Sequence, residues 1–193
     1  MNTPKNTQEL FDLYAERGDE PYGEAITQTE HALQCAALAR GEGASDAMIA
    51  AALFHDVGHL VVEIQSEPGF KMDEDDDDHE AIGARVLAHL FGPAVAGPVA
   101  LHVTAKRWRC STDPGYYDRL SEASKMTLKA QGGLLSDEEC LRFEEHPGFP
   151  DALALRTWDD EGKIEGLDVG SLNDYVEMVS SLATAWSRAR HAR

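Results

Sequence analysis

The stretch LFHDVGH, residues 53–59, places a histidine directly before an aspartate at the end of an alanine-rich run. Imidazole nitrogens and carboxylate oxygens both bind metal ions, and such a pair at a helix end can turn toward one point. His55 and Asp56 alone are weak support for a metal site, because this pair is common. Further ligand types stand at separate points along the chain: His31, His79, His102 and Asp159. If helices bring these residues together, they form a metal centre.

The ligand types narrow the choice of metal. Imidazole and carboxylate without thiolate suit iron, manganese or nickel better than a structural zinc ion. The three cysteines, Cys35, Cys110 and Cys140, are widely spaced and form no CxxC pair. They therefore predict neither a zinc–thiolate site nor a disulfide framework, and we interpret them as buried or incidental thiols.

Helices must position these residues, because apolar residues recur at helical spacing through most of the chain and strand-like alternation is hard to find. The pattern predicts an all-α protein, a compact helical bundle of about eight or nine helices. In the second half, helices are expected within residues 121–133, 149–163 and 172–190. No internal repeat or linker divides the chain, so residues 1–193 are expected to form a single domain.

Cap signals predict where two of the ligands lie. Thr27, followed three residues later by a glutamate, forms a capping box that opens a helix ending at Gly41. His31 lies in the first turn of this helix. A later helix is expected to begin near Asp78, which places His79 in its first turn.

The HD pair is expected at the end of a helix. Ser45 is a good N-cap, and Gly58 is a natural C-cap for the run between them, so His55 and Asp56 fall in the last turn. His102 is expected within a helix over residues 93–108.

Composition limits the possible functions. The 42% hydrophobic content is ordinary for a globular chain, and no apolar run approaches the roughly 20 residues of a membrane span. A net charge of −18 would repel nucleic acid phosphates. The first residues lack the charged and apolar regions of a secretory signal, which predicts a cytoplasmic protein.

The ordered pattern of a histidine, an HD pair and a distant aspartate resembles the HD-domain superfamily, whose core is all-α. The two histidines between the HD pair and the last aspartate resemble its binuclear branch. That resemblance implies two metal sites that share Asp56 as a bridge. The first would comprise His31, His55, Asp56 and Asp159, and the second Asp56, His79 and His102.

Most HD proteins are phosphohydrolases, in which metals activate water against a phosphate ester. A smaller branch consists of mixed-valent di-iron oxygenases, including enzymes that cleave the carbon–phosphorus bond of 1-hydroxy-2-aminoethylphosphonate. Residues from about 20 to 160 resemble this phosphonate branch closely. The resemblance implies two iron ions, Fe(II) and Fe(III), an organophosphonate and O2 as substrates, and phosphate with glycine betaine or glycine as products.

The amine end of such a substrate is expected near the segment YGEAITQTEH. Glu24 stands seven residues before His31, where the family has a glutamate that meets the substrate ammonium. In the family a tyrosine three residues before this glutamate can occupy iron, whereas here Pro21 is three before and Tyr22 two before. Either a one-residue shift of the loop lets Tyr22 reach the iron, or the tyrosine has lost or changed its role of occupying the iron until substrate arrives. The changed pocket mouth favours a trimethylated amine.

A dianionic phosphonate needs cationic and hydroxyl donors beside the metals. His59 and Lys106 follow ligand residues by three and four positions, and Arg156 precedes Asp159 by three, so each shares a helix face with a ligand. The resemblance implies that these residues bind the substrate, with His59 and Lys106 acting closest to the reaction. It also implies neutral phosphonate contacts from Ser124, Thr127 and Gln131.

Two other functions are consistent with the same residues. The nearer one is a binuclear metal-dependent phosphohydrolase acting on a nucleotide or another phosphate ester. The other is a catalytically silent HD domain that binds a ligand or partner, which the complete ligand set disfavours. Oxygen consumption with substrate separates the oxygenase from the hydrolase.

Overall fold

The computed structural model describes residues 3–19, 25–65 and 78–192. Tyr22 and Glu24 lie outside these ranges. Within them the chain forms only helices, which confirms the all-α prediction. The elements are α1 Thr7–Arg17, α2 Gln28–Gly41, α3 Asp46–Phe54, α4 Val57–Gln65, α5 His79–Phe91, α6 Pro93–Thr112, α7 Tyr116–Arg119, α8 Glu122–Ala130, α9 Asp137–Glu144, α10 Phe149–Glu161, the 3-10 helix η1 Leu172–Tyr175 and α11 Val176–His191.

The described residues form more helices than the expected eight or nine, for local reasons. The run expected as one helix over residues 45–58 is two helices, α3 and α4, and the short α7 and η1 were not expected separately. The two expected cap signals are present: Thr27 forms the capping box of α2, and Ser45 caps α3. A further capping box, at Ser136, begins α9. No helix in the described ranges combines the length and apolar character of a membrane span.

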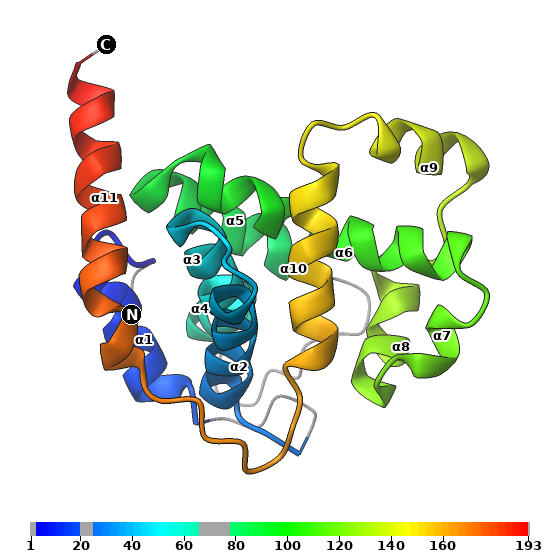
Figure 1. Ribbon diagram of the computed structural model, residues 1–193, viewed down its shortest axis with the longest axis horizontal. Coiled ribbons are helices and arrows are strands. Elements are labelled where there is room, and N and C mark those ends of the chain that lie inside the picture. Colours follow the sequence, from blue (N-terminus) through cyan, green and yellow to red (C-terminus); the bar gives the residue numbers. More distant parts are fainter. Residues whose placement is uncertain (1–2, 20–24, 66–77, 193) are drawn as a thin grey trace.

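Helix α10 occupies the middle of the molecule, between two groups of helices (Figure 1). On one side it contacts α2 and α3, and on the other it contacts α6, beyond which α7, α8 and α9 lie. Helix α6 also packs against α3 and α5. Residues on α2, α3, α5, α6 and α10 can therefore meet in the space that these five helices enclose.

Hydrophobic clusters of different size support the two sides. The main core is built around α3, whose alanine-rich sequence is buried from Met48 to Phe54. The aromatic ring of Phe54 packs 5.7 Å from that of Phe11 and 5.6 Å from that of Tyr14, measured between centroids. A separate small cluster joins the C-terminal part of α6 to α7 and α8, through Cys110, Tyr116, Leu120 and Leu128. Helix α8 is thus supported by its own few apolar contacts.

Gly58 has a different role from the expected one. It does not end a helix: α3 ends at Phe54, a turn follows at His55 and Asp56, and Gly58 lies in the first turn of α4. A Cβ atom at Gly58 would lie 1.9 Å from the carbonyl oxygen of His79. The glycine is therefore required because α4 and α5 touch through their backbones beside His79.

Replacing Gly58 with alanine is expected to destabilise the protein by at least about 1–3 kcal/mol, because the main chain of α5 must move to admit the methyl group. Gly41→Ala is the matched control, since a Cβ at Gly41 meets nothing within 4 Å. The free energy of unfolding, measured by urea denaturation, checks this expectation. Equal stability of the two variants would contradict the close backbone contact.

Candidate metal centre

The carboxylate of Asp56 lies between two pairs of imidazoles. Its Oδ2 atom is 3.3 Å from Nε2 of His55 and 3.7 Å from Nε2 of His31. Its Oδ1 atom is 3.5 Å from Nε2 of His79 and 3.7 Å from Nε2 of His102. Each oxygen thus faces one histidine pair, which is the arrangement a carboxylate needs to bridge two ions.

Asp159 completes the group around His31 and His55. Its Oδ1 atom is 3.3 Å from Nε2 of His31 and 3.8 Å from Nε2 of His55. This buried oxygen accepts no hydrogen bond of good geometry from the described residues. Ligand atoms about 2.1 Å from a common metal ion stand roughly 3 to 3.5 Å apart, so this spacing fits a metal ion.

The second group consists of Asp56, His79 and His102. The Nε2 atoms of His79 and His102 are 3.2 Å apart, as are those of His31 and His55 in the first group. The donors in both groups are nitrogen and oxygen, the set that suits iron or manganese. The structure therefore brings together all six residues for which the sequence predicts metal binding.

Backbone carbonyls orient three of the four imidazoles. A ring Nδ1 can donate its hydrogen to a carbonyl oxygen, which leaves the Nε2 lone pair directed at the centre. The Nδ1–oxygen distances are 2.8 Å from His31 to Gly162, 2.9 Å from His55 to Ala52 and 2.7 Å from His102 to Val99. In His55 and His102 the acceptor belongs to the preceding turn, so these rings are set by their own helices.

Charge at the site also favours a cation. Burial and the neighbouring His79 lower the pKa of His102 to about 3, so this imidazole is neutral and able to bind a metal. Burial lowers the pKa of His55, but the carboxylates of Asp56 and Asp159 outweigh this effect and raise it to about 10. The proton that these carboxylates retain on His55 is one that a bound metal ion would displace.

The cysteine nearest the centre has a different role. Sγ of Cys35 lies 3.7 Å from Nδ1 of His31, but the thiol donates to the carbonyl oxygen of Trp158 at 3.3 Å. Burial, and then the charge of Asp159, hold the pKa of this thiol well above its ordinary value. A protonated thiol is a poor ligand. All three cysteines are free and buried, as the sequence predicts.

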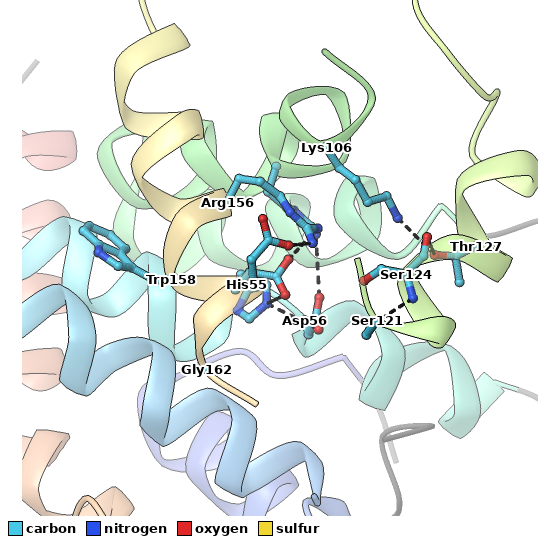
Figure 2. Close-up of polar contacts among 12 residues, drawn as sticks. His55, Asp56, Lys106, Ser121, Ser124, Thr127, Arg156, Trp158 and Gly162 are labelled. Carbon is cyan, nitrogen blue, oxygen red and sulfur yellow. Dashed lines mark hydrogen bonds and ion pairs between the residues drawn. The ribbon is translucent and has the colours of Figure 1, made fainter. Parts of the chain in front are cut away.

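Hydroxyl and cationic groups gather on the α8 side of the centre. Lys106, on α6 and 3% exposed, extends toward α8, where its Nζ donates to Oγ1 of Thr127 at 3.0 Å (Figure 2). Ser124 lies one turn earlier on α8 and is buried. Gln131 follows as the C-cap residue of that helix. Lys106, Thr127 and Ser124, all expected to contact phosphonate, therefore lie close together.

Two other expected substrate contacts lie against the ligands. The ring of His59 stacks on that of His79, with centroids 3.9 Å apart. Arg156 is buried, and its Nη1 donates to Oδ2 of Asp159 at 2.7 Å. The same guanidinium is paired with Asp160 and donates to the hydroxyl of Tyr116 at 2.9 Å. Arg156 therefore orients Asp159, a predicted metal ligand, as well as lying beside the candidate centre.

Four residues near the site were not anticipated: Gln34, Tyr116, Asp160 and Lys163. Gln34 follows His31 by three positions, and Lys163 follows Asp159 by four, the same spacing that marked Lys106. Extending the helical-face argument to these positions would have found both. The three histidines that are not assigned to the site, His89, His146 and His191, are exposed.

Comparison with known proteins identifies relatives across most of the chain. Residues 29–132 match the HD domain. The chain is 44% identical over 172 residues to the hydroxymethylphosphonate dioxygenase of Gimesia maris, which covers 89% of this chain and 85% of that relative. It is 39% identical over 172 residues to the glycine-betaine-forming [1-hydroxy-2-(trimethylamino)ethyl]phosphonate dioxygenase of Leisingera caerulea, covering 88% of this chain and 86% of the relative. An uncharacterized protein of Acanthamoeba polyphaga mimivirus is 35% identical over 177 residues, covering 91% of this chain and 80% of that protein.

Proposed function

This chain belongs to the HD-domain family, and on that premise we propose that it is a di-iron dioxygenase that cleaves the carbon–phosphorus bond of a 1-hydroxyphosphonate. The observation that carries the proposal is the Asp56 carboxylate, with one histidine pair facing each oxygen, beside the cationic and hydroxyl groups of Lys106 and Thr127. The two curated relatives named above are dioxygenases of phosphonates, which supports this reaction over phosphate ester hydrolysis.

Two iron ions, Fe(II) and Fe(III), would supply the redox chemistry and the activation of O2. His31, His55, Asp56 and Asp159 would hold one ion, and Asp56, His79 and His102 the other. The protein's contribution is to fix the direction of each donor, through the carbonyl bonds to Nδ1 and the ion pair between Arg156 and Asp159.

The remaining side chains bind and orient the substrate. The phosphonate dianion would accept charge-assisted hydrogen bonds from Lys106 and Arg156 and neutral ones from Ser124, Thr127 and Gln131. His59, beside His79, would contact the substrate near its reacting carbon. Holding C1 in one orientation beside the metals is the main catalytic device, because it removes the entropy cost of meeting the oxidant.

The reaction balances without a further reductant. The C1–H and C1–P bonds break, and the four electrons released reduce O2, whose two oxygen atoms end in the carboxylate and phosphate products. With a 1-hydroxy-2-(trimethylamino)ethylphosphonate, the carbon product is glycine betaine. With hydroxymethylphosphonate, which has no amine, it is formate.

These two compounds and the free amine, 1-hydroxy-2-aminoethylphosphonate, are the substrate candidates. The trimethylated compound is our first choice, because Glu24 and the displaced Tyr22 indicate a reshaped amine pocket, and because the 39% identical relative is named for it. Hydroxymethylphosphonate is the second, favoured by the 44% identical relative. A single domain over residues 1–193, phosphonate catabolism as the setting and a cytoplasmic location are further parts of this proposal.

Anaerobic incubation of iron-loaded protein with each phosphonate, followed by O2 and a phosphate assay, tests the function. We expect one phosphate for each O2 consumed. Phosphate release from phosphate esters without O2 would instead show a hydrolase.

Among the amine substrates, the trimethylated compound should have the higher kcat/KM, because a trimethylammonium donates no hydrogen bonds and Glu24 is the only acceptor we assign. An equal or higher kcat/KM for the free amine would reject the trimethylated compound as the preferred substrate, but not the assignment of the protein as a dioxygenase.

A further inference from the structure

The segment that follows α10 forms hydrogen bonds with α2 at two successive points. The carbonyl oxygen of Gly162 lies 2.8 Å from Nδ1 of His31. One turn further along α2, the amide of Gln34 donates to the carbonyl oxygen of Ile164 at 2.8 Å and accepts from its N–H at 2.9 Å. Gln34 is 2% exposed, so these bonds are shielded from water. The backbone on both sides of Lys163 is therefore fixed.

This attachment directs Lys163 into the site. Its Nζ atom lies 3.4 Å from Oδ1 of Asp159 and 3.4 Å from Oγ of Ser124, and its side chain is only 13% exposed. Lys163 thus extends from the metal-ligand side of the centre to α8, the helix that carries the expected neutral phosphonate contacts. Lys106 approaches the same helix from α6.

The charges around Arg156 indicate why another cation is needed. The guanidinium is paired with two carboxylates, Asp159 and Asp160, so its positive charge is already opposed locally. Among the side chains, a phosphonate dianion placed here would therefore also need the ammonium groups of Lys106 and Lys163, although Lys163 itself lies 3.4 Å from Asp159. Of the described lysines, Lys106 and Lys163 are the two that lie within hydrogen-bond reach of α8 hydroxyls.

We propose that Lys163 is a substrate-binding residue, a third cation that contacts the phosphonate together with Lys106 and Ser124. This inference rests on the proposed function for the identity of the anion. If Lys163 binds the anion directly, its loss weakens anion binding and leaves the metals in place. If it acts only by neutralising Asp159, its loss alters metal content instead.

The test measures binding of inorganic phosphate to the iron-loaded protein by calorimetry, at a pH where phosphate is dianionic. Lys163→Met, which keeps the chain length and removes the charge, is expected to weaken binding by about 10- to 100-fold with iron content unchanged. Lys163→Arg should restore most of the affinity, because a guanidinium also donates to phosphate. Lys129→Met is the matched control, since Lys129 is exposed on α8 and should bind phosphate like the unaltered protein.

Two results would overturn the inference. One is phosphate affinity in Lys163→Met within twofold of the unaltered protein, and the other is a loss of iron that accounts for the weaker binding. Neither the phosphate affinity nor the iron content depends on catalytic turnover. If the unaltered protein binds phosphate through Lys163 yet consumes no O2 with any phosphonate, the proposed function fails and the anion site stands.

Discussion

Asp56→Ala is expected to lose both metal ions, because this one carboxylate supplies an oxygen to each histidine group. Removal of a hydrogen-bond partner of a ligand already costs up to about 100-fold in metal affinity, so loss of a shared ligand should cost at least that at each site. Metal analysis of purified, iron-supplemented protein should fall from two equivalents to about none. Turnover should disappear with the metal.

The control for this change is Asp151→Ala, because Asp151 is an exposed carboxylate in the first turn of α10. It should retain two equivalents and full activity. If Asp56→Ala retains two equivalents, or if the unaltered protein never binds more than one, the bridging assignment is wrong.

Lys106→Met should lower kcat/KM for the phosphonate by roughly 30- to 5000-fold, which corresponds to about 2–5 kcal/mol. The reason is that a buried ammonium facing a dianion makes a charge-assisted bond that no neighbouring water replaces. Iron should stay at two equivalents, since the carbonyl bonds that orient the imidazoles do not involve Lys106. Turnover at the unaltered rate would place the phosphonate elsewhere.

Arg156→Ala provides an informative contrast with the lysine change. Arg156 donates to Asp159 at 2.7 Å, so its loss should weaken metal binding in the first group as well as substrate binding. Substrate affinity measured at saturating iron separates the two effects. Lys106→Met should be unaffected by added iron, whereas part of the Arg156→Ala defect should be recovered.

Local signals made much of the fold predictable. The capping box at Thr27 and the N-cap at Ser45 depend on residues only three positions apart, so the sequence contains all the information that sets those helix starts. The order of histidines and aspartates along the chain likewise indicated the six residues that the fold brings together.

Features that depend on distant segments were not predictable in the same way. A glycine at position 58 is typical of a helix end. The structure instead requires a glycine there because a Cβ atom would collide with the carbonyl oxygen of His79, which belongs to another helix. The pairing of Arg156 with Tyr116 depends on where α7 packs, which no local pattern reports. The hydrogen bond of Gln34 could not be predicted from local sequence either, because its partner Ile164 lies 130 residues away.

The small cluster formed by Cys110, Tyr116, Leu120 and Leu128 separates two tasks within one chain. Helix α8, which would meet the phosphonate, is supported by this cluster, whereas the turn after α3 that carries His55 and Asp56 is anchored in the main core. The link between the two regions is polar: Tyr116 of the cluster accepts a hydrogen bond from Arg156 at 2.9 Å, and Arg156 is paired with Asp159. A packing defect in the small cluster is therefore expected to disturb the phosphonate contacts on α8 before it disturbs the turn that carries His55 and Asp56, because that turn is supported by the much larger main core.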